Sequence, residues 1–254
     1  QIFRRQEYWY LQQSNSLEPH IYLYTISIMR KKLLFIIFCL SALTGFAQTA
    51  NTHSQTDDLK GKRIGVIGDS YVKNHKEAVE NTWHYAFAKK HGLEYFNYGR
   101  NGNSIAYSSP RWGEAMYIRY KEMADNLDYV IVIGGHNDAF KLDSIGGIDN
   151  FKAKLEILCK GLVEKYPTAK IFFFTRWNCK NFKGSDSEKV IDAMVEVCGN
   201  YSIPIFDCAR KGGIYADNDA FRKIYFQGEK DTAHLNAKGH VRFLKVAENF
   251  ILQY

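Results

Sequence analysis

Short, uninterrupted apolar runs constrain the fold of this chain more than any other feature. The runs centred on Val132 and Phe173 lack the alternation of apolar and polar residues that a half-exposed strand shows. Strands covered on both faces are typical of parallel sheets flanked by helices. Five strands are predicted, at 63–68, 94–98, 129–134, 170–175 and 203–207.

Amphipathic segments fill the intervals between these strands. Ser185 and Glu188 have the spacing of a helix capping box, and Asn236 is a candidate N-cap for the last helix, in which His240 is expected to pack locally. The first helical segment holds His75 and His84, without a functional role, and an apolar face of Val79, Trp83, Ala86 and Phe87. The alternation of strands and helices predicts a three-layer α/β/α sandwich around a five-stranded parallel sheet.

The front of the chain has the features of an export signal. Met29 is followed by Arg30 and two lysines, then by an apolar run at 33–40 and small residues that end at Ala47. That run is too short for a membrane span, so the protein is expected to be secreted or periplasmic, with no stable membrane anchor once the signal is cleaved. The predicted organisation is an upstream extension outside the mature protein at 1–28, a signal peptide at 29–47, a linker at 48–60 and one folded domain at 61–254.

Net charge gives no indication of a nucleic-acid partner. The 254 residues carry a formal charge of +7, but five basic and two acidic residues lie within 1–47, so the rest keeps +4. The remaining basic residues are spread along the chain without a basic run. No nucleic-acid binding is therefore predicted.

Cysteine usage gives no metal motif. Four of the five cysteines follow residue 47, and no CxxC or Cys/His metal spacing is present. Cys159 and Cys198 lie on apolar helix faces, which is typical of buried thiols. Cys179 and Cys208 each follow a predicted strand, and export would permit a disulfide between them.

Polar and glycine-containing turns follow the first three predicted strands. Gly68-Asp69-Ser70 ends the first, Gly102 lies in a turn after the second, and Asn137 follows the third. The carboxyl ends of parallel strands meet at one edge of a sheet, where open α/β sheets bind ligands. Ser70, Gly102 and Asn137 are therefore expected to lie close together.

Asp231 and His234 stand three residues apart before the last predicted helix. At this spacing in a turn, the carboxylate reaches the Nδ1–H of His234 and leaves Nε2 free as a base. Such a base can take the proton of the Ser70 hydroxyl, which is otherwise a weak nucleophile. Ser70, Asp231 and His234 are therefore predicted as catalytic residues. The Ser70 and Gly102 N–H groups and the Asn137 amide are the predicted oxyanion hole.

These blocks together resemble the SGNH (GDSL-type) hydrolase family over residues 62–254. Gly68-Asp69-Ser70 matches the nucleophile block, Gly102 the oxyanion glycine, Gly135-x-Asn137-Asp138 the Asn block, and Asp231-x-x-His234 the acid–base block. Tyr71 stands where the family's Gly-Asp-Ser-Leu signature has leucine. The resemblance implies a flavodoxin-like sandwich and ester hydrolysis by a serine nucleophile, with no metal or other cofactor.

Two other interpretations of these residues are open. A metallophosphoesterase would use Asp69, Asp138, Asp231 and His234 as ligands, but the Asp-x-His pair expected in such a site is absent. Asp69 is expected to hydrogen-bond to nearby backbone instead, and His136 to border the cleft. A catalytically inactive, glycan-binding module of the same fold is the second alternative, although all four blocks are intact.

The loops suggest a class of substrate. No long apolar lid segment is present to shelter a fatty chain, and large aromatic residues stand beside polar ones after the second and fourth strands. These residues are Tyr107, Trp112, Trp177 and Asn178. Together with export, they predict a short-chain esterase that removes acetyl or similar groups from a small-molecule or glycan ester. The alternative within the family is a lipase or lysophospholipase.

Overall fold

A parallel sheet forms the centre of the fold. The structure is a computed structural model, and it describes residues 59–254. The sheet has the order β2-β1-β3-β4-β5, and every neighbouring pair of its strands is parallel. The strands are β1 (Arg63–Gly68), β2 (Glu94–Gly99), β3 (Tyr129–Ile133), β4 (Lys170–Phe174) and β5 (Ile205–Phe206). This confirms the predicted five-stranded parallel sheet.

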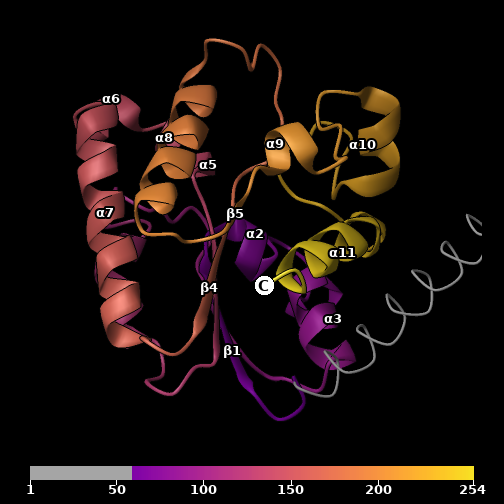
Figure 1. Cartoon of the computed structure of the whole chain (residues 1–254). Helices are drawn as coiled ribbons and strands as arrows, with labels where there is room; N and C mark the ends of the chain where they lie inside the picture. The colour runs from indigo at the N-terminus through magenta and orange to yellow at the C-terminus, as the bar shows by residue number, and fades with distance from the viewer. Residues whose placement is uncertain (1–58) are drawn as a thin grey trace, which may run out of the picture. The chain divides into compact units, whose positions relative to one another are not determined.

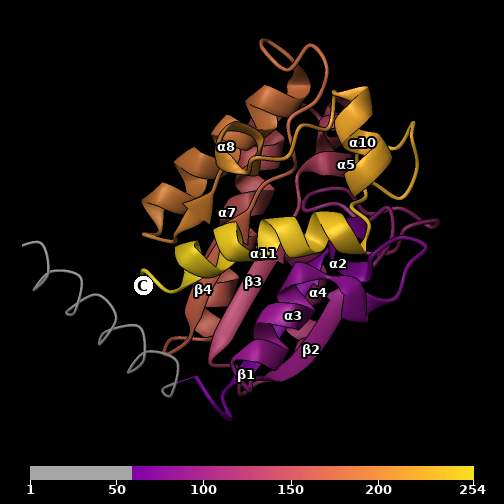
Figure 2. The same ribbon diagram turned by 90° about the vertical axis from the view of Figure 1, so that its right-hand side faces the viewer.

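Helices cover both faces of the sheet. Figure 1 views the sheet between α7 (Ile148–Lys165) and α8 (Asp186–Asn200) on one side and α3 (Trp83–Lys90) and α11 (Ala237–Ile251) on the other. In Figure 2, α11 crosses in front of the strands. Alternate strand residues enter separate cores, so Val132 and Phe173 pack toward the α7–α8 layer, whereas Ile131 and Phe174 pack toward the α3–α11 layer. The three-layer α/β/α sandwich is thereby confirmed.

Shorter helices follow the strands or line the sheet edge. They are α2 (Ser70–Lys73), α4 (Met116–Arg119), α5 (His136–Ala139), α6 (Leu142–Ile145), α9 (Cys208–Lys211) and α10 (Asp219–Tyr225), with 3-10 turns at Val79–Asn81 and Tyr120–Glu122. Asn236 caps α11 as predicted, because its side chain accepts the Gly239 N–H. Ser185 likewise accepts the Glu188 N–H, but the Glu188 carboxylate reaches back to the Gly184 N–H and not to that of Ser185.

Several local predictions were wrong. β5 is shorter than the predicted 203–207, because Pro204 has no N–H to give to the ladder and Asp207 already caps α9. Cys179 and Cys208 do not form a disulfide, and the four cysteines of the described residues are free. His75 lies outside the first helix, since the chain turns away at Asn74 and α3 begins only at Trp83.

The front of the chain lies outside the described residues. The predicted extension at 1–28, the signal peptide at 29–47 and most of the linker at 48–60 therefore stay predictions, as does the domain boundary at residue 61. Within residues 59–254, none of the helices is long and apolar enough to cross a bilayer.

Candidate active site

The carboxyl ends of the first three strands carry the predicted residues. Ser70 opens α2 directly after β1, Gly102 lies in the turn after β2, and Asn137 lies in α5 after β3. Asp69 is the N-cap of α2, and its carboxylate accepts the Tyr71 N–H at 2.8 Å. The expectation that Asp69 bonds to nearby backbone is confirmed.

A chain of hydrogen bonds joins Ser70, His234 and Asp231. The Nδ1–H of His234 donates to Oδ2 of Asp231 at 2.9 Å, and the Ser70 hydroxyl donates to Nε2 of His234 at 2.9 Å. The Asp231 and His234 side chains are about one-fifth exposed or less, at 21% and 16%. The structure thus brings Ser70 to His234, which lies 164 positions away in sequence, in the arrangement that activates a serine nucleophile.

The local backbone holds Asp231 in its charged form. Its Oδ1 accepts the N–H groups of Ala233 at 2.8 Å and His234 at 2.9 Å. Burial disfavours the charged form, but the hydrogen bonds from the His234 ring and from these two N–H groups outweigh it and lower the pKa of Asp231 to about 2. A carboxylate charged at neutral pH fixes the Nδ1–H tautomer of His234 and leaves Nε2 as an acceptor.

Buried polar residues fix the loop that carries Gly102. Arg119 donates to the Asn103 side chain at 2.8 Å, to the Tyr98 carbonyl at 2.6 Å and to the Gly68 carbonyl at 2.7 Å, and so links the ends of β1 and β2 to this loop. Gly102 has a φ of +73°, and a Cβ there would overlap the ring of Trp112. Only glycine fits this turn without strain.

Asn137 holds the same loop, which sequence reasoning did not foresee. Its amide donates to the Asn103 carbonyl at 2.8 Å and to the Asp69 carboxyl at 3.3 Å. The N–H groups of Ser70 and Gly102, by contrast, have no acceptor among the residues that the structure describes. Two of the three predicted oxyanion donors are therefore unpaired, and the third is already engaged.

His75 is a residue of the site that the sequence did not reveal. Its ring stacks on that of His234, with centroids 4.0 Å apart and planes at 10°. A left-handed backbone, with φ of +50°, and a hydrogen bond from the Asn101 amide to its carbonyl place it there. Burial, and then the neighbouring His234, lower the pKa of His75, so it stays neutral beside the base. No sequence spacing signals such a contact.

The aromatic residues predicted to face the substrate are mostly used for packing. Trp177 is only 3% exposed, its ring lies tilted against that of Tyr71 with centroids 5.4 Å apart, and it donates its Nε1–H to the Ala233 carbonyl at 3.0 Å. It supports the segment that bears Asp231 and offers no free face, so its predicted contact with a sugar ring was wrong. Trp112 packs against Gly102, and Tyr107 is half-buried under the Lys141 ammonium group.

The ligand set of the metallophosphoesterase interpretation does not converge. The carboxylate of Asp138 instead accepts the N–H groups of Ile105 and Ala106. Among the described residues, one group has the spacing to hold a metal ion, and it consists of His75, Asp231 and His234. Both ring nitrogens of His234 are already engaged by Asp231 and Ser70.

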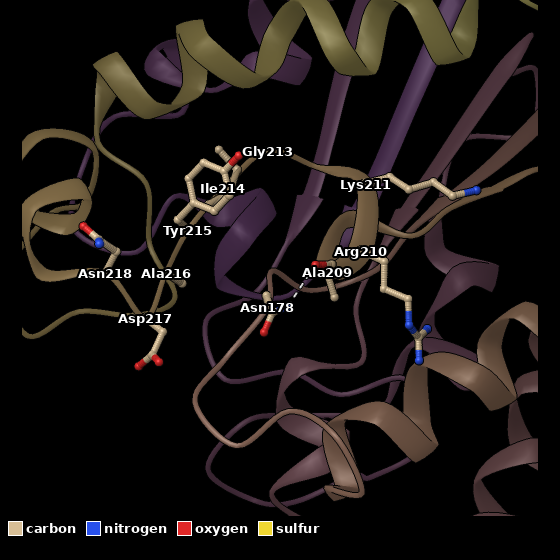
Figure 3. A pocket seen from close by; sticks show the side chains of 10 residues that line it. All are labelled: Asn178, Ala209, Arg210, Lys211, Gly213, Ile214, Tyr215, Ala216, Asp217 and Asn218. Atoms are coloured by element: carbon tan, nitrogen blue, oxygen red, sulfur yellow. Dashed lines mark hydrogen bonds between the residues drawn. The ribbon is translucent and has the colours of Figure 1, made fainter.

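A separate pocket of about 780 Å³ lies between the loop after β4, α9 and the segment before α10. Figure 3 shows Asn178 on its lining, where its amide donates to the Ala209 carbonyl, while Arg210 and Lys211 extend away from Tyr215. Asn178 thus lines this pocket, whereas none of the Ser70, His234 and Asp231 side chains does.

An α/β/α sandwich with a hydrogen-bonded Ser–His–Asp set at the strand ends is an arrangement that serine hydrolases use. The model of the GDSL-like Lipase/Acylhydrolase family matches residues 66–242, and the chain belongs to this family of ester hydrolases. A search of curated proteins found no match.

Solved structures share the fold. A protein from Lactobacillus plantarum is 24% identical, with a TM-score of 0.65 over 77% of this chain and 98% of its own. The psychrotrophic esterase EstA from Pseudoalteromonas is 13% identical, with a TM-score of 0.58 over 76% of this chain and 97% of its own. A family two carbohydrate esterase from Clostridium thermocellum is 13% identical, with a TM-score of 0.55 over 76% of this chain and 63% of its own.

Proposed function

We propose that this protein is an exported serine esterase that removes acetyl or similarly short acyl groups from carbohydrate esters. The observation that carries the proposal is the pair of 2.9 Å hydrogen bonds that links Ser70 through His234 to Asp231. No other residues of the site offer a nucleophile in contact with a base of fixed tautomer.

The proposed reaction has two steps. The Ser70 Oγ attacks the ester carbonyl carbon while its proton passes to Nε2 of His234. The resulting imidazolium, stabilised by the Asp231 carboxylate, then gives this proton to the leaving alcohol and an acyl-Ser70 ester remains. In the second step, His234 takes a proton from water, whose oxygen attacks the acyl carbon, and Ser70 leaves with the proton.

The oxyanion formed in each step needs donors that are not already paired. The free N–H groups of Ser70 and Gly102 fit this role. The Asn137 amide would join them by exchanging its longer contact, the 3.3 Å bond to Asp69, for the oxyanion, while its 2.8 Å bond to the Asn103 carbonyl holds the side chain in place.

The short acyl group and the carbohydrate rest on three observations. The sequence has no apolar lid segment, the residues at 29–47 have the pattern of an export signal, and a structural neighbour is a carbohydrate esterase. Export places the enzyme where polysaccharides are common. Trp177 is buried, but Phe140, which contacts the His136 ring, is 74% exposed. Phe140 is therefore the aromatic residue that can contact a sugar ring.

Turnover of nitrophenyl esters from acetyl to octanoyl, followed by acetate release from acetylated oligosaccharides, tests the proposal. Preference for acetyl with acetate release is the expected result. Preference for octanoyl without release from any glycan would assign the protein to the lipase side of the family. Absence of turnover on every ester, with intact glycan binding, would identify an inactive binding module.

A further inference from the structure

Arg176 is a buried positive charge that the proposed reaction does not use. It is the second residue after β4, next to Thr175, and it is 2% exposed. Among residues 59–254, no carboxylate lies within ion-pair distance of its guanidinium group. Burying an unpaired charge is costly, so such a residue is seldom retained for packing alone.

The Arg176 guanidinium has spare donors. Of the five N–H bonds that an arginine carries, one on Nε points to the Trp177 carbonyl at 3.2 Å and one on Nη1 to the Ser187 hydroxyl at 2.8 Å. Nη2 has no hydrogen-bond partner in the described part of the chain. It is nevertheless not one of the fully enclosed polar atoms without a partner. Nη2 therefore reaches solvent through a small opening.

The surroundings of Arg176 belong to the candidate active site. The guanidinium lies 5.7 Å from the ring centroid of Phe140, which packs edge-on against His136 at 5.2 Å. His136 in turn contacts the hydroxyl of Tyr71, the residue after Ser70, at 3.4 Å. Burial, and then the charge of Arg176, lower the pKa of His136 to about 3, so His136 is neutral and does not compete for an anion.

We infer that Arg176 binds a carboxylate of the substrate, which makes the preferred substrates acylated acidic sugars. A carboxylate that enters beside Phe140 meets the free Nη2 donors and neutralises the buried charge. Charge-assisted hydrogen bonds of this kind are the strong ones, and arginine suits the planar carboxylate. The exposed Phe140 ring would cover the apolar face of the same sugar. This inference rests on the proposed function, because it names the alcohol part of that ester.

Two matched esters test the inference. They are methyl glucuronide and methyl glucoside, each acetylated at the same hydroxyl, with acetate release as the readout. Wild type is expected to favour the glucuronide by at least about 10-fold in kcat/KM, which is the effect of one charge-assisted hydrogen bond. Arg176→Met should bring this ratio close to one, and Arg176→Lys should keep part of it.

Controls separate position from net charge and from folding. Arg63→Met removes the same charge at the opposite end of β1 and should keep the wild-type ratio. Methyl glucuronide without an acetyl group should raise the melting temperature of wild type, whereas methyl glucoside should not. This binding test needs neither turnover nor a variant that folds.

The outcomes are distinct. If wild type hydrolyses p-nitrophenyl acetate but treats the two sugar esters alike, the inference about Arg176 is wrong and the esterase stands. If p-nitrophenyl acetate is not hydrolysed either, the proposed function itself fails. A preference for p-nitrophenyl hemisuccinate over p-nitrophenyl butyrate, without one for glucuronide, would place the carboxylate on the acyl side and overturn the assignment to acidic sugars.

Discussion

Replacing Asp231 by asparagine separates the charge of this residue from its shape. Oδ1 accepts two backbone N–H groups, those of Ala233 and His234, so the amide oxygen of the variant must occupy that position. The amide nitrogen then faces Nδ1 of His234, which has to accept a hydrogen bond, and the ring proton moves to Nε2. His234 in this tautomer cannot take the Ser70 proton.

The size of the effect follows from this forced tautomer. We expect Asp231→Asn to lower kcat by about 10⁴-fold, the loss seen when a serine protease triad is held in the wrong tautomer. Asp231→Ala should cost less activity, because its His234 is free to adopt either tautomer. The alanine variant leaves the two N–H groups without their acceptor, and it should lose about 1 kcal/mol of unfolding free energy for each.

Two measurements on wild type and the two variants check this reasoning. Turnover of p-nitrophenyl acetate ranks their activities, and thermal unfolding ranks their stabilities. Activity should rank wild type, then Asp231→Ala, then Asp231→Asn, while stability should rank Asp231→Asn above Asp231→Ala. If Asp231→Asn keeps activity within about 10-fold of wild type, Asp231 does not set the His234 tautomer and the reasoning fails.

Three further predictions concern the rest of the site. Gly102→Ala should lower both kcat and melting temperature, because the added methyl group meets the Trp112 ring. Gly184→Ala is the control: at a φ of +77° with open space around it, the added methyl group should lower only the melting temperature, through backbone strain. His75→Ala should reduce kcat/KM by about 2- to 10-fold through loss of an aromatic stack, with partial rescue in His75→Phe, and an unchanged rate would make the stack incidental. Burial raises the pKa of Asp69 to about 7 from 3.8, so the native state binds a proton that the unfolded state lacks, and stability falls as pH rises between these values. Asp69→Asn should therefore gain on wild type by up to about 4 kcal/mol between pH 4 and 7 in denaturant unfolding, and a constant difference would contradict the shift.

Local signals allowed much of the site to be predicted. Asp231 and His234 meet because they stand three positions apart in a turn, and Ser70 reaches them because it follows a strand of a parallel sheet. Both contacts can be inferred from the sequence, from residue spacing and from the positions of apolar runs. The positions of β1, β3 and β4 were predictable from their apolar runs, and β2 was predicted although it contains Glu94 and Asn97.

Other parts of the site depend on contacts that no spacing encodes. Arg119 joins Gly68, Tyr98 and Asn103, which become neighbours only when the sheet forms. His75 reaches His234 through a left-handed backbone that is uncommon for residues other than glycine. The burial of Trp177, the engaged Asn137 amide and the unpaired Arg176 belong to the same class, because each is decided by tertiary packing.

Labelling with a fluorophosphonate probe tests the central claim most directly, because the probe requires a serine that a neighbouring base has activated. The account predicts a single covalent adduct on Ser70 of the wild-type protein, located by mass spectrometry of its peptides. Ser70→Ala should abolish the adduct, and His234→Ala should slow its formation by at least about 10²-fold. An adduct on any other residue, or none on a folded protein, would contradict the assignment of Ser70, His234 and Asp231 as the catalytic set.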